Sequence, residues 1–208
     1  MKNVTSVPQG KVEVPDFKLL DELRVVADET AMIVVDMQND FVKPDGNLSV
    51  PAAMDTVPHI KDLLQRARQA GVKVAYSQDT HLPEDKEEAI WPSHCVKGTE
   101  GWRIYEHLKP QPTEIVFQKP RYDAFYGTSL DHYLNQVWKV KNLIVVGTVA
   151  NICVLHTMAS AGLRWLHVIV PANGISALSE FEQALTLHQT TSLYQGDVVR
   201  TCSDIQFK

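Results

Sequence analysis

The sequence predicts an α/β protein, a three-layer Rossmann-like fold with a mostly parallel, six-stranded sheet flanked by helices. Short runs rich in Val and Ile alternate along the chain with longer segments that have helical spacing. A parallel strand pair needs a long crossover connection, and a helix is the usual one. With 208 residues, the chain can bury a sizeable core without disulfides or metals to hold it together.

The expected strands are six short apolar runs bounded by Gly, Asp or Pro. Continuous apolar runs, rather than alternating ones, are typical of strands that are covered on both faces of a parallel sheet. In chain order, the runs are residues 31–36, 72–77, 114–118, 142–147, 166–170 and 197–201.

The clearest expected helix covers residues 60–70, where apolar side chains recur with i, i+3, i+4, i+7 spacing. Thr56 and Pro58 are typical of a helix start, and Gly71 is typical of the position just after a helix end. The other expected helices are residues 129–137, 152–163 and 180–193.

The first 27 residues are polar and irregular, so we expect an N-terminal arm at 1–27 and one domain at 28–208. The 20 Lys and Arg against 25 Asp and Glu give a net charge of −5, which offers no basic footprint for nucleic acid or anionic lipid. No run approaches the ~18 apolar residues of a membrane span, and the start lacks the apolar segment of a signal peptide. We therefore expect a cytoplasmic protein whose partners include neither nucleic acid nor membranes.

The cysteines are three in number, Cys95, Cys153 and Cys202, and lie too far apart in the sequence for a disulfide framework. Each is therefore expected to be a free thiol. Cys202 lies near the C-terminus on a predicted edge strand and is interpreted as a packing residue.

Chemically useful residues follow the expected strands, where open α/β sheets bind their ligands. Asp36 and Lys119 each end a strand, and Cys153 lies near a helix start, where backbone N–H groups favour a thiolate. Taken singly, a buried cysteine is usually a small apolar residue, and a charge at a strand end is usually solvated or a cap. Together they can divide the work, because Lys119 can stabilise the thiolate while Asp36 takes the thiol proton and returns it to a leaving amine.

Three segments resemble the signature segments of the isochorismatase-like cysteine hydrolases, and the resemblance extends over about residues 29–202. The segments are Asp36-Met-Gln-Asn-Asp-Phe41, Lys119 with the following Arg121-Tyr-Asp-Ala-Phe-Tyr-Gly127, and the turn at 147–154. The resemblance implies that Asp36, Lys119 and Cys153 form a catalytic triad. The family includes amidases, in which a thiolate attacks a carboxamide to give a thioester and ammonia. It also includes isochorismatases, which lack the thiol.

The family resemblance also implies a non-proline cis peptide bond, here Thr148–Val149, with backbone N–H groups of Val149 and Cys153 forming an oxyanion hole. The chain departs from the family pattern at this turn. Where Gly-Val-Ala-Thr is common, it has Gly147-Thr-Val-Ala150, so a hydroxyl is absent at 150 and present at 148.

A second group consists of Asp79, His81 and His94, because a carboxylate and two imidazoles can form a facial set on a divalent transition metal. The alternative for Asp79 and His81 alone is hydrogen bonding within a loop. The pattern with Trp91-Pro-Ser-His94-Cys95 is similar to that of nicotinamidases, which implies a divalent metal ion, zinc first, with iron and manganese as alternatives. Cys95 is not expected to be a ligand, since neighbours on an extended chain point in opposite directions.

Phe41, Trp91 and Tyr122 match, by motif position, the residues that hold nicotinamide in that family, although each alone could be an ordinary core or surface aromatic. The leading hypothesis is a nicotinamidase that converts nicotinamide to nicotinate and ammonia. The alternatives are an N-carbamoylsarcosine amidase-like or ureido-amide hydrolase with the same triad, or a non-catalytic relative that binds a small ligand. The resemblance further implies a homo-oligomer, dimer or tetramer.

Overall fold

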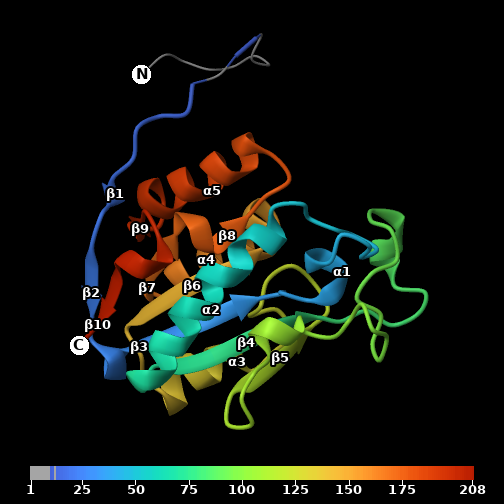
Figure 1. The fold of residues 1–208 in the computed structure, drawn as a ribbon, viewed down its shortest axis with the longest axis horizontal. Coiled ribbons are helices and arrows are strands. Elements are labelled where there is room, and N and C mark those ends of the chain that lie inside the picture. The colour runs from blue at the N-terminus through green and yellow to red at the C-terminus, as the bar shows by residue number, and fades with distance from the viewer. Residues whose placement is uncertain (1–9, 12) are drawn as a thin grey trace.

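The computed structural model describes residues 10, 11 and 13–208, and Figure 1 shows its central sheet with helices packed on it. The sheet has eight strands in the order β1-β9-β7-β6-β3-β4-β5, with β8 pairing to β6 outside this path. Every pair is parallel. The predicted parallel α/β fold is confirmed, and the sheet holds eight strands rather than six.

All six predicted strands are present, with boundaries that differ by a few residues. They are β3 (Thr30–Val35), β4 (Lys73–Asp79), β5 (Ile115–Lys119), β6 (Asn142–Thr148), β7 (His167–Pro171) and β9 (Asp197–Val199).

The strands that the sequence did not predict are short. Strands β1 (Leu19–Leu20) and β8 (Ile175–Ser176) join the main sheet, and β2 (Leu23–Val25) pairs with β10 (Ile205–Phe207) in a second, two-stranded sheet. Residues 19–25, which the sequence placed in the arm, therefore contribute one strand to each sheet. Residues 1–9 and 12 of that arm lie outside the described residues.

Apart from the short α1, which the sequence did not predict, the helices follow the predicted segments with shifted ends. They are α1 (Asn39–Val42), α2 (Ala53–Gln69), α3 (Leu130–His132) running into a π turn (Tyr133–Val137), α4 (Leu155–Gly162) preceded by a π turn (Ala150–Val154), and α5 (Glu180–Ser192). None of these described helices is both long and apolar enough to cross a bilayer.

Helix α2 begins at Ala53, earlier than predicted, so Pro58 lies inside it rather than at its start. Buried Ala53 and Val57 extend the apolar stripe upstream, and this packing outweighs the hydrogen bond that proline cannot donate. The end matches the prediction. Gly71 has a φ of +80°, and the N–H groups of Gly71 and the next residue bond to carbonyls of the last helical turn, as in a Schellman motif.

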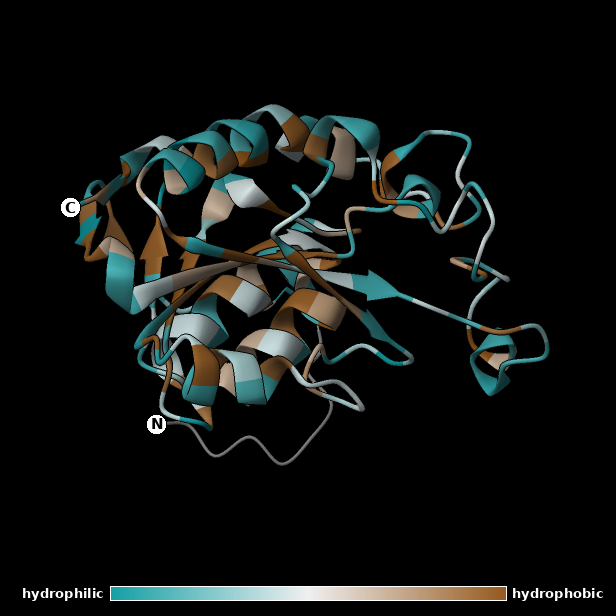
Figure 2. Cartoon of the chain, turned by 90° about the horizontal axis from the view of Figure 1, so that it is seen from below, coloured by the Kyte–Doolittle hydropathy of each residue, from teal (hydrophilic) through white to brown (hydrophobic). Residues whose placement is uncertain are grey.

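The core consists of two apolar layers, one on each face of the sheet. Successive side chains of β3 point to opposite faces, so Met32 and Val34 pack with α2 while Ile33 and Val35 pack with the helices of the other face. Figure 2 shows this arrangement, with helices above and below the sheet. Burial on both faces explains why the strand sequences are continuous apolar runs.

The C-terminal segment differs from the prediction after β9. Cys202 lies in a 3₁₀ turn (Cys202–Asp204) rather than on an edge strand, and it is buried. The side chains of Thr201 and Asp204 cap this turn, so the extended strand does not continue through Cys202. The interpretation of Cys202 as a packing residue agrees with its burial.

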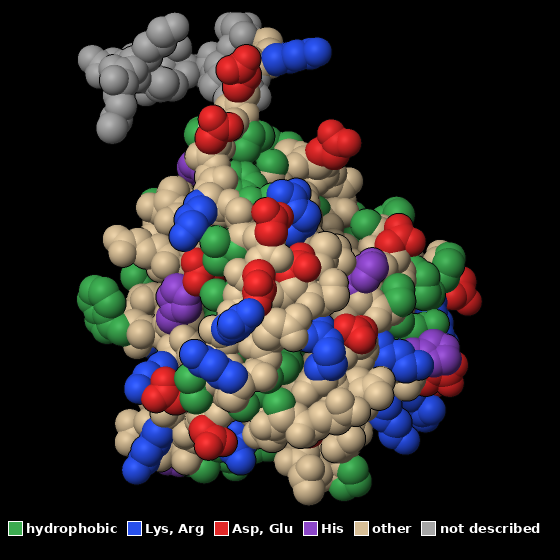
Figure 3. Space-filling model, turned by 60° about the vertical axis from the view of Figure 1, so that its left-hand side comes forward, with side chains coloured by type: hydrophobic (Ala, Val, Ile, Leu, Met, Phe, Trp, Pro, Cys, Tyr) green, Lys and Arg blue, Asp and Glu red, His purple; other side chains and the backbone are tan. Residues whose placement is uncertain are grey.

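On the face in Figure 3, acidic and basic side chains are interspersed.

Candidate active site

The carboxyl ends of β3, β4, β5 and β6 meet at one edge of the sheet, and this edge gathers the predicted triad. Lys119 Nζ lies 2.8 Å from Asp36 Oδ2 and 3.6 Å from Cys153 Sγ. It also lies 3.0 Å from Asp79 Oδ1, because Lys119 and Asp79 are register partners on neighbouring strands. All four residues are buried. The structure thus brings the three predicted residues together and adds Asp79 to the group.

Local backbone geometry places the acid of this group. Asp36 follows β3 with a φ of +48°, a left-handed conformation that non-glycine residues seldom adopt. The hydroxyl of Ser77, on β4, donates a 2.7 Å hydrogen bond to Asp36 Oδ1 and leaves Oδ2 facing Lys119. Nearby, Gly147 allows β6 to approach β3, since a Cβ there would lie 2.1 Å from the Val35 carbonyl oxygen.

Cys153 lies in the first turn of the helical segment that leads into α4. The N–H groups of Ile152 and Val154 both bond to the carbonyl oxygen of Val149 and close this turn. The peptide bond Thr148–Val149 is cis, as the resemblance implied. The hydroxyl of Thr148 accepts a 3.0 Å hydrogen bond from buried Ser176, so the displaced hydroxyl is engaged in the core rather than in the pocket.

Burial and charge set the protonation of the group. Burial raises the pKa of the Cys153 thiol well above its usual value; Lys119 opposes this rise, and Asp36 and Asp79 add to it. Burial also raises the pKa of Asp36 despite Lys119. The pKa of Lys119 is raised because the neighbouring negative groups outweigh its burial. The thiol is therefore neutral beside a charged lysine and needs a base before it can act as a nucleophile.

We expect Asp36→Asn to lower the pKa of Cys153 while reducing turnover. Removing the carboxylate removes a negative charge that disfavours the thiolate, so the pKa of the Cys153 thiol falls. The midpoint pH of iodoacetamide alkylation at Cys153, followed by mass spectrometry on chelator-treated protein, should move to lower pH. Turnover should nevertheless fall by about 10²–10⁴-fold, because the base is lost. An unchanged midpoint, or unchanged turnover with an unchanged acid limb of the pH profile, would contradict the role given to Asp36.

The predicted metal ligands also come together at this edge. His81 Nε2 and His94 Nε2 lie 3.0 Å and 3.3 Å from Asp79 Oδ2, and one ligand atom from each of the three residues lies within 4.8 Å of the others. Burial alone would raise the pKa of Asp79, but Lys119 and the two imidazoles lower it, so the carboxylate is ionised.

Whether this group fits a metal depends on the contacts of the imidazole nitrogens that face away from Asp79, which are Nδ1 of His81 and of His94. His94 Nδ1 lies 2.7 Å from the carbonyl oxygen of Pro92, and His81 Nδ1 lies 3.5 Å from Asp85 Oδ2. The carbonyl oxygen at His94 Nδ1 holds the proton there and leaves the Nε2 lone pair free to face inward, whereas His81 Nδ1 has no hydrogen-bond partner among the described residues and only faces the Asp85 carboxylate. Asp79, His81 and His94 therefore fit a divalent metal ion, as their residue types and spacing predicted.

Cys95 is not part of this group of ligand atoms. The reason differs from the predicted one, because Cys95 has a φ of +46° and is not extended. Its N–H donates a 2.7 Å hydrogen bond to Asp40 Oδ2, and Asp40 Oδ1 accepts the N–H of Asn47. Asp40 was not singled out from the sequence. It connects the loop that carries His94 to the segment after α1, which carries the pocket residues Leu48 and Val50.

Glu87 was also missed. It lines the pocket, is 5% exposed, and forms a second set of potential metal-ligating atoms with His81 and Asp85. Burial, with the charge of Asp79, raises its pKa. In the sequence, Glu87 is one of several acids in a charged run, and no spacing distinguishes it from its exposed neighbour Glu88.

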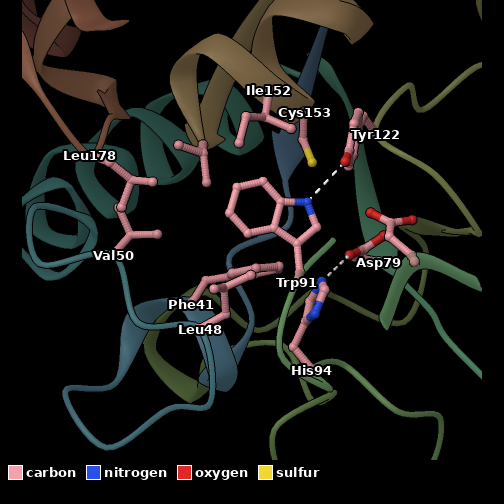
Figure 4. Close-up of a pocket in the computed structure, with 12 residues that line it drawn as sticks. Phe41, Leu48, Val50, Asp79, Trp91, His94, Tyr122, Ile152, Cys153 and Leu178 are labelled. Atoms are coloured by element: carbon pink, nitrogen blue, oxygen red, sulfur yellow. Dashed lines mark hydrogen bonds and ion pairs between the residues drawn. The ribbon is translucent and has the colours of Figure 1, made fainter. Parts of the chain in front are cut away.

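The pocket beside Cys153 contains the three predicted aromatic residues, and Figure 4 shows the Trp91 indole at its centre. The indole N–H donates a 2.9 Å hydrogen bond to the Tyr122 hydroxyl, and Phe41 forms part of the wall. The remaining cavity has a volume of about 30 Å³. The other apolar walls, which carry no motif and were not predicted, are Leu48, Val50, Val149, Ile152 and Leu178.

Comparison with known proteins identifies the family. Residues 30–202 match the isochorismatase domain, which covers most of the chain. The chain belongs to the isochorismatase family. Within it, the chain is 32% identical over 160 residues to the ureidoacrylate amidohydrolase RutB of Agrobacterium fabrum, covering 64% of this chain and 69% of that protein.

Two solved structures of named amidases are similar to this isochorismatase-family chain. The N-carbamoylsarcosine amidase of Thermoplasma acidophilum has a TM-score of 0.74 and 32% identity, covering 83% of this chain and 96% of that one. The pyrazinamidase/nicotinamidase of Streptococcus mutans UA159 has a TM-score of 0.77 and 27% identity, covering 81% and 99%. These similar members of the family are named for different amide substrates.

Proposed function

We propose that the protein is a metal-dependent amidohydrolase that converts nicotinamide to nicotinate and ammonia. The observation that carries this proposal is the composition of the pocket. Cys153, the metal-fitting residues Asp79 and His94, and the aromatic walls Phe41 and Trp91 all line the same cavity. A flat ring between apolar walls can present a carboxamide to the thiol and a ring nitrogen to the metal group.

In the proposed reaction, Asp36 takes the Cys153 proton as the sulfur attacks the carboxamide carbon. Backbone N–H groups of Val149 and Cys153 receive the developing oxyanion. Asp36 then gives its proton to the departing nitrogen, so that ammonia leaves and a thioester remains. Asp36 next activates a water, which hydrolyses the thioester to the carboxylate and restores the thiol. Lys119 remains charged throughout and stabilises both the thiolate and Asp36.

A metal held by Asp79, His81 and His94 would supply a Lewis acid that binds the pyridine nitrogen of the substrate. The residues themselves position this contact. The Gln38 side chain holds the backbone of Asp79 in place. The Asp79 N–H donates to the Gln38 side-chain oxygen at 2.7 Å, and the Asp79 carbonyl oxygen accepts from the Gln38 amide at 2.9 Å. The ligand set is therefore anchored to the same strand ends as the triad.

The second candidate is an N-carbamoylsarcosine amidase-like or ureido-amide hydrolase, which the similarities to RutB and to the Thermoplasma enzyme favour. Ureidoacrylate and N-carbamoylsarcosine each carry a carboxylate. The charged residues that line this pocket, other than histidine, are Asp79 and Glu87, both acidic. A buried carboxylate without a cationic partner is costly, so the lining favours a neutral carboxamide.

The test is ammonia release from nicotinamide, pyrazinamide, N-carbamoylsarcosine and simple aliphatic amides, with metal analysis on the same preparation. Nicotinamide should have the highest kcat/KM, with pyrazinamide next, and the protein should carry a stoichiometric divalent metal. His94→Ala should lose the metal and lower nicotinamide turnover by more than the roughly 10–100-fold that outer-shell changes cost.

The matched control for this test is His107→Ala, since His107 is exposed and lies outside the pocket. It should keep both metal and activity. A protein without metal, nicotinamide turnover that survives His94→Ala, or a preference for N-carbamoylsarcosine would reject the nicotinamidase assignment.

A further inference from the structure

Residues 82–93 form a loop that is closed at its base. The His81 N–H bonds to the Cys95 carbonyl oxygen at 3.1 Å, and the Lys97 N–H bonds to the His81 carbonyl oxygen at 2.9 Å. Between these ties, the backbone hydrogen bonds of the loop stay within it and include a 3₁₀ turn (Lys86–Ala89). Its backbone is therefore attached to the rest of the described chain at the base alone.

Side chains from one short segment fasten the rest of the loop. Arg121 Nη1 lies 3.1 Å from Asp85 Oδ1 and 3.6 Å from Glu87 Oε2. The next residue, Tyr122, accepts the hydrogen bond from the Trp91 indole. Arg121 and Tyr122 follow β5 after one intervening residue, so the same strand end that supplies Lys119 also holds the loop.

The loop also blocks the pocket. Its Trp91 indole occupies the centre of the cavity in Figure 4 and leaves about 30 Å³ beside it. That space admits one or two water molecules and is far below the ~300–1,000 Å³ of pockets that hold drug-sized ligands. An aromatic amide can therefore reach Cys153 only when the indole moves, and the indole is carried by this loop.

We propose that residues 82–93 are a lid, that Arg121 latches this lid shut, and that substrate and product exchange through release of the latch. Arg121 is thereby a positioning residue that acts through Asp85 and Glu87. Asp85 Oδ2 also lies 3.5 Å from Nδ1 of His81, so the closed lid holds a negative charge beside a candidate metal ligand. The identity of the aromatic ligand rests on the proposed function, whereas the lid rests on the contacts of the loop.

The first test is limited trypsin cleavage after Lys86, an exposed residue in the lid, followed by mass spectrometry. In Arg121→Gln the cleavage rate should rise by about two- to fivefold, the scale expected for loss of a partly exposed ion pair. Arg121→Lys should restore part of the protection. Raising the salt concentration from ~0.1 to ~1 M should speed this cleavage in the wild type and have little effect in Arg121→Gln, since salt screens exposed pairs.

The matched control is Arg164→Gln. Arg164 has a similar side-chain exposure, 38% against 41% for Arg121, and its own 3.0 Å ion pair with Asp131. It should leave cleavage after Lys86 unchanged. If Arg121→Gln cleaves at the wild-type rate, or if Arg164→Gln is cleaved as fast as Arg121→Gln, there is no such latch.

The second readout is kinetic and uses the amide that the wild type turns over. Because the closed lid leaves no room for the amide, loss of the latch should lower KM by up to the same two- to fivefold, since more of the protein is open to bind substrate, and it should change kcat by less than KM. A fall in kcat at unchanged KM would overturn the latch. If nicotinamide is not a substrate, the proposed function fails, and cleavage after Lys86 still decides whether the lid exists.

Discussion

Replacing Cys153 by alanine should lower kcat for amide hydrolysis by at least about 10⁴-fold, because Cys153 supplies the nucleophilic sulfur that lies against the charged Lys119. Ammonia release measures this loss. Acid-quenched wild-type protein should show an acyl adduct on Cys153 by mass spectrometry, as expected for the thioester, and Cys153→Ala should show none. Because the substitution removes one sulfur atom and leaves Asp79, His81 and His94 in place, the variant should still fold and bind metal.

The control for this result is Cys202→Ala, which removes a buried thiol in the C-terminal 3₁₀ turn. Burial raises the pKa of Cys202 to about 12, so it is an unreactive thiol. This variant should retain activity and the adduct. Turnover that persists in Cys153→Ala would exclude the nucleophile proposed above. A wild type that forms no adduct and releases no ammonia from any amide in the panel would favour a non-catalytic, ligand-binding relative.

Replacing Lys119 by methionine should have the largest effect on stability. The substitution keeps much of the volume but leaves Asp36 and Asp79 buried without their cation. Removing one partner of a buried ion pair costs about 3–5 kcal/mol of the free energy of unfolding. Urea denaturation of metal-free protein at neutral pH should show this loss. Lys141→Met, which breaks an exposed pair with Glu29, should cost less than about 1 kcal/mol.

The pH dependence of this loss identifies its cause. In Lys119→Met, both buried carboxyl groups should have higher pKa values in the folded protein than in the unfolded chain, so the folded state binds protons more tightly. Stability is then retained at low pH and lost as the pH rises through the raised pKa values. The difference from the wild type should therefore shrink towards pH ~5. A loss that is equal at acid and neutral pH would indicate altered packing instead of charge.

The fold could be predicted from sequence wherever burial leaves a continuous pattern. Strand β3 is covered on both faces, so its residues read as one apolar run bounded by a polar residue. Strands β1 and β8 have two residues each, which is too few for any periodicity. The start of α2 was misplaced because Pro58 is a common first-turn residue, whereas tertiary packing of Ala53 determined the actual start.

The candidate site was predictable where chemistry and strand ends coincide. A charged residue that ends an apolar strand, such as Asp36 or Lys119, is conspicuous in sequence. The contact between Lys119 and Asp79 was not, since it depends on the register of β4 against β5. The apolar pocket walls come from separate loops, and a residue such as Leu178 has no chemical signature that marks it as a wall. The ties of Arg121 to Asp85 and Glu87 likewise depend on how a loop folds back.

Asp79 connects the two halves of the site through its opposite oxygen atoms. Oδ1 contacts Lys119, which contacts the thiol, and Oδ2 faces the two imidazoles. A divalent cation held by Asp79, His81 and His94 would offset the negative charge of Asp79, which raises the pKa of the Cys153 thiol. Thermodynamic linkage would then make metal affinity and thiolate formation reciprocal, so that each promotes the other by the same factor. The loaded protein would hold a more acidic thiol than the metal-free one.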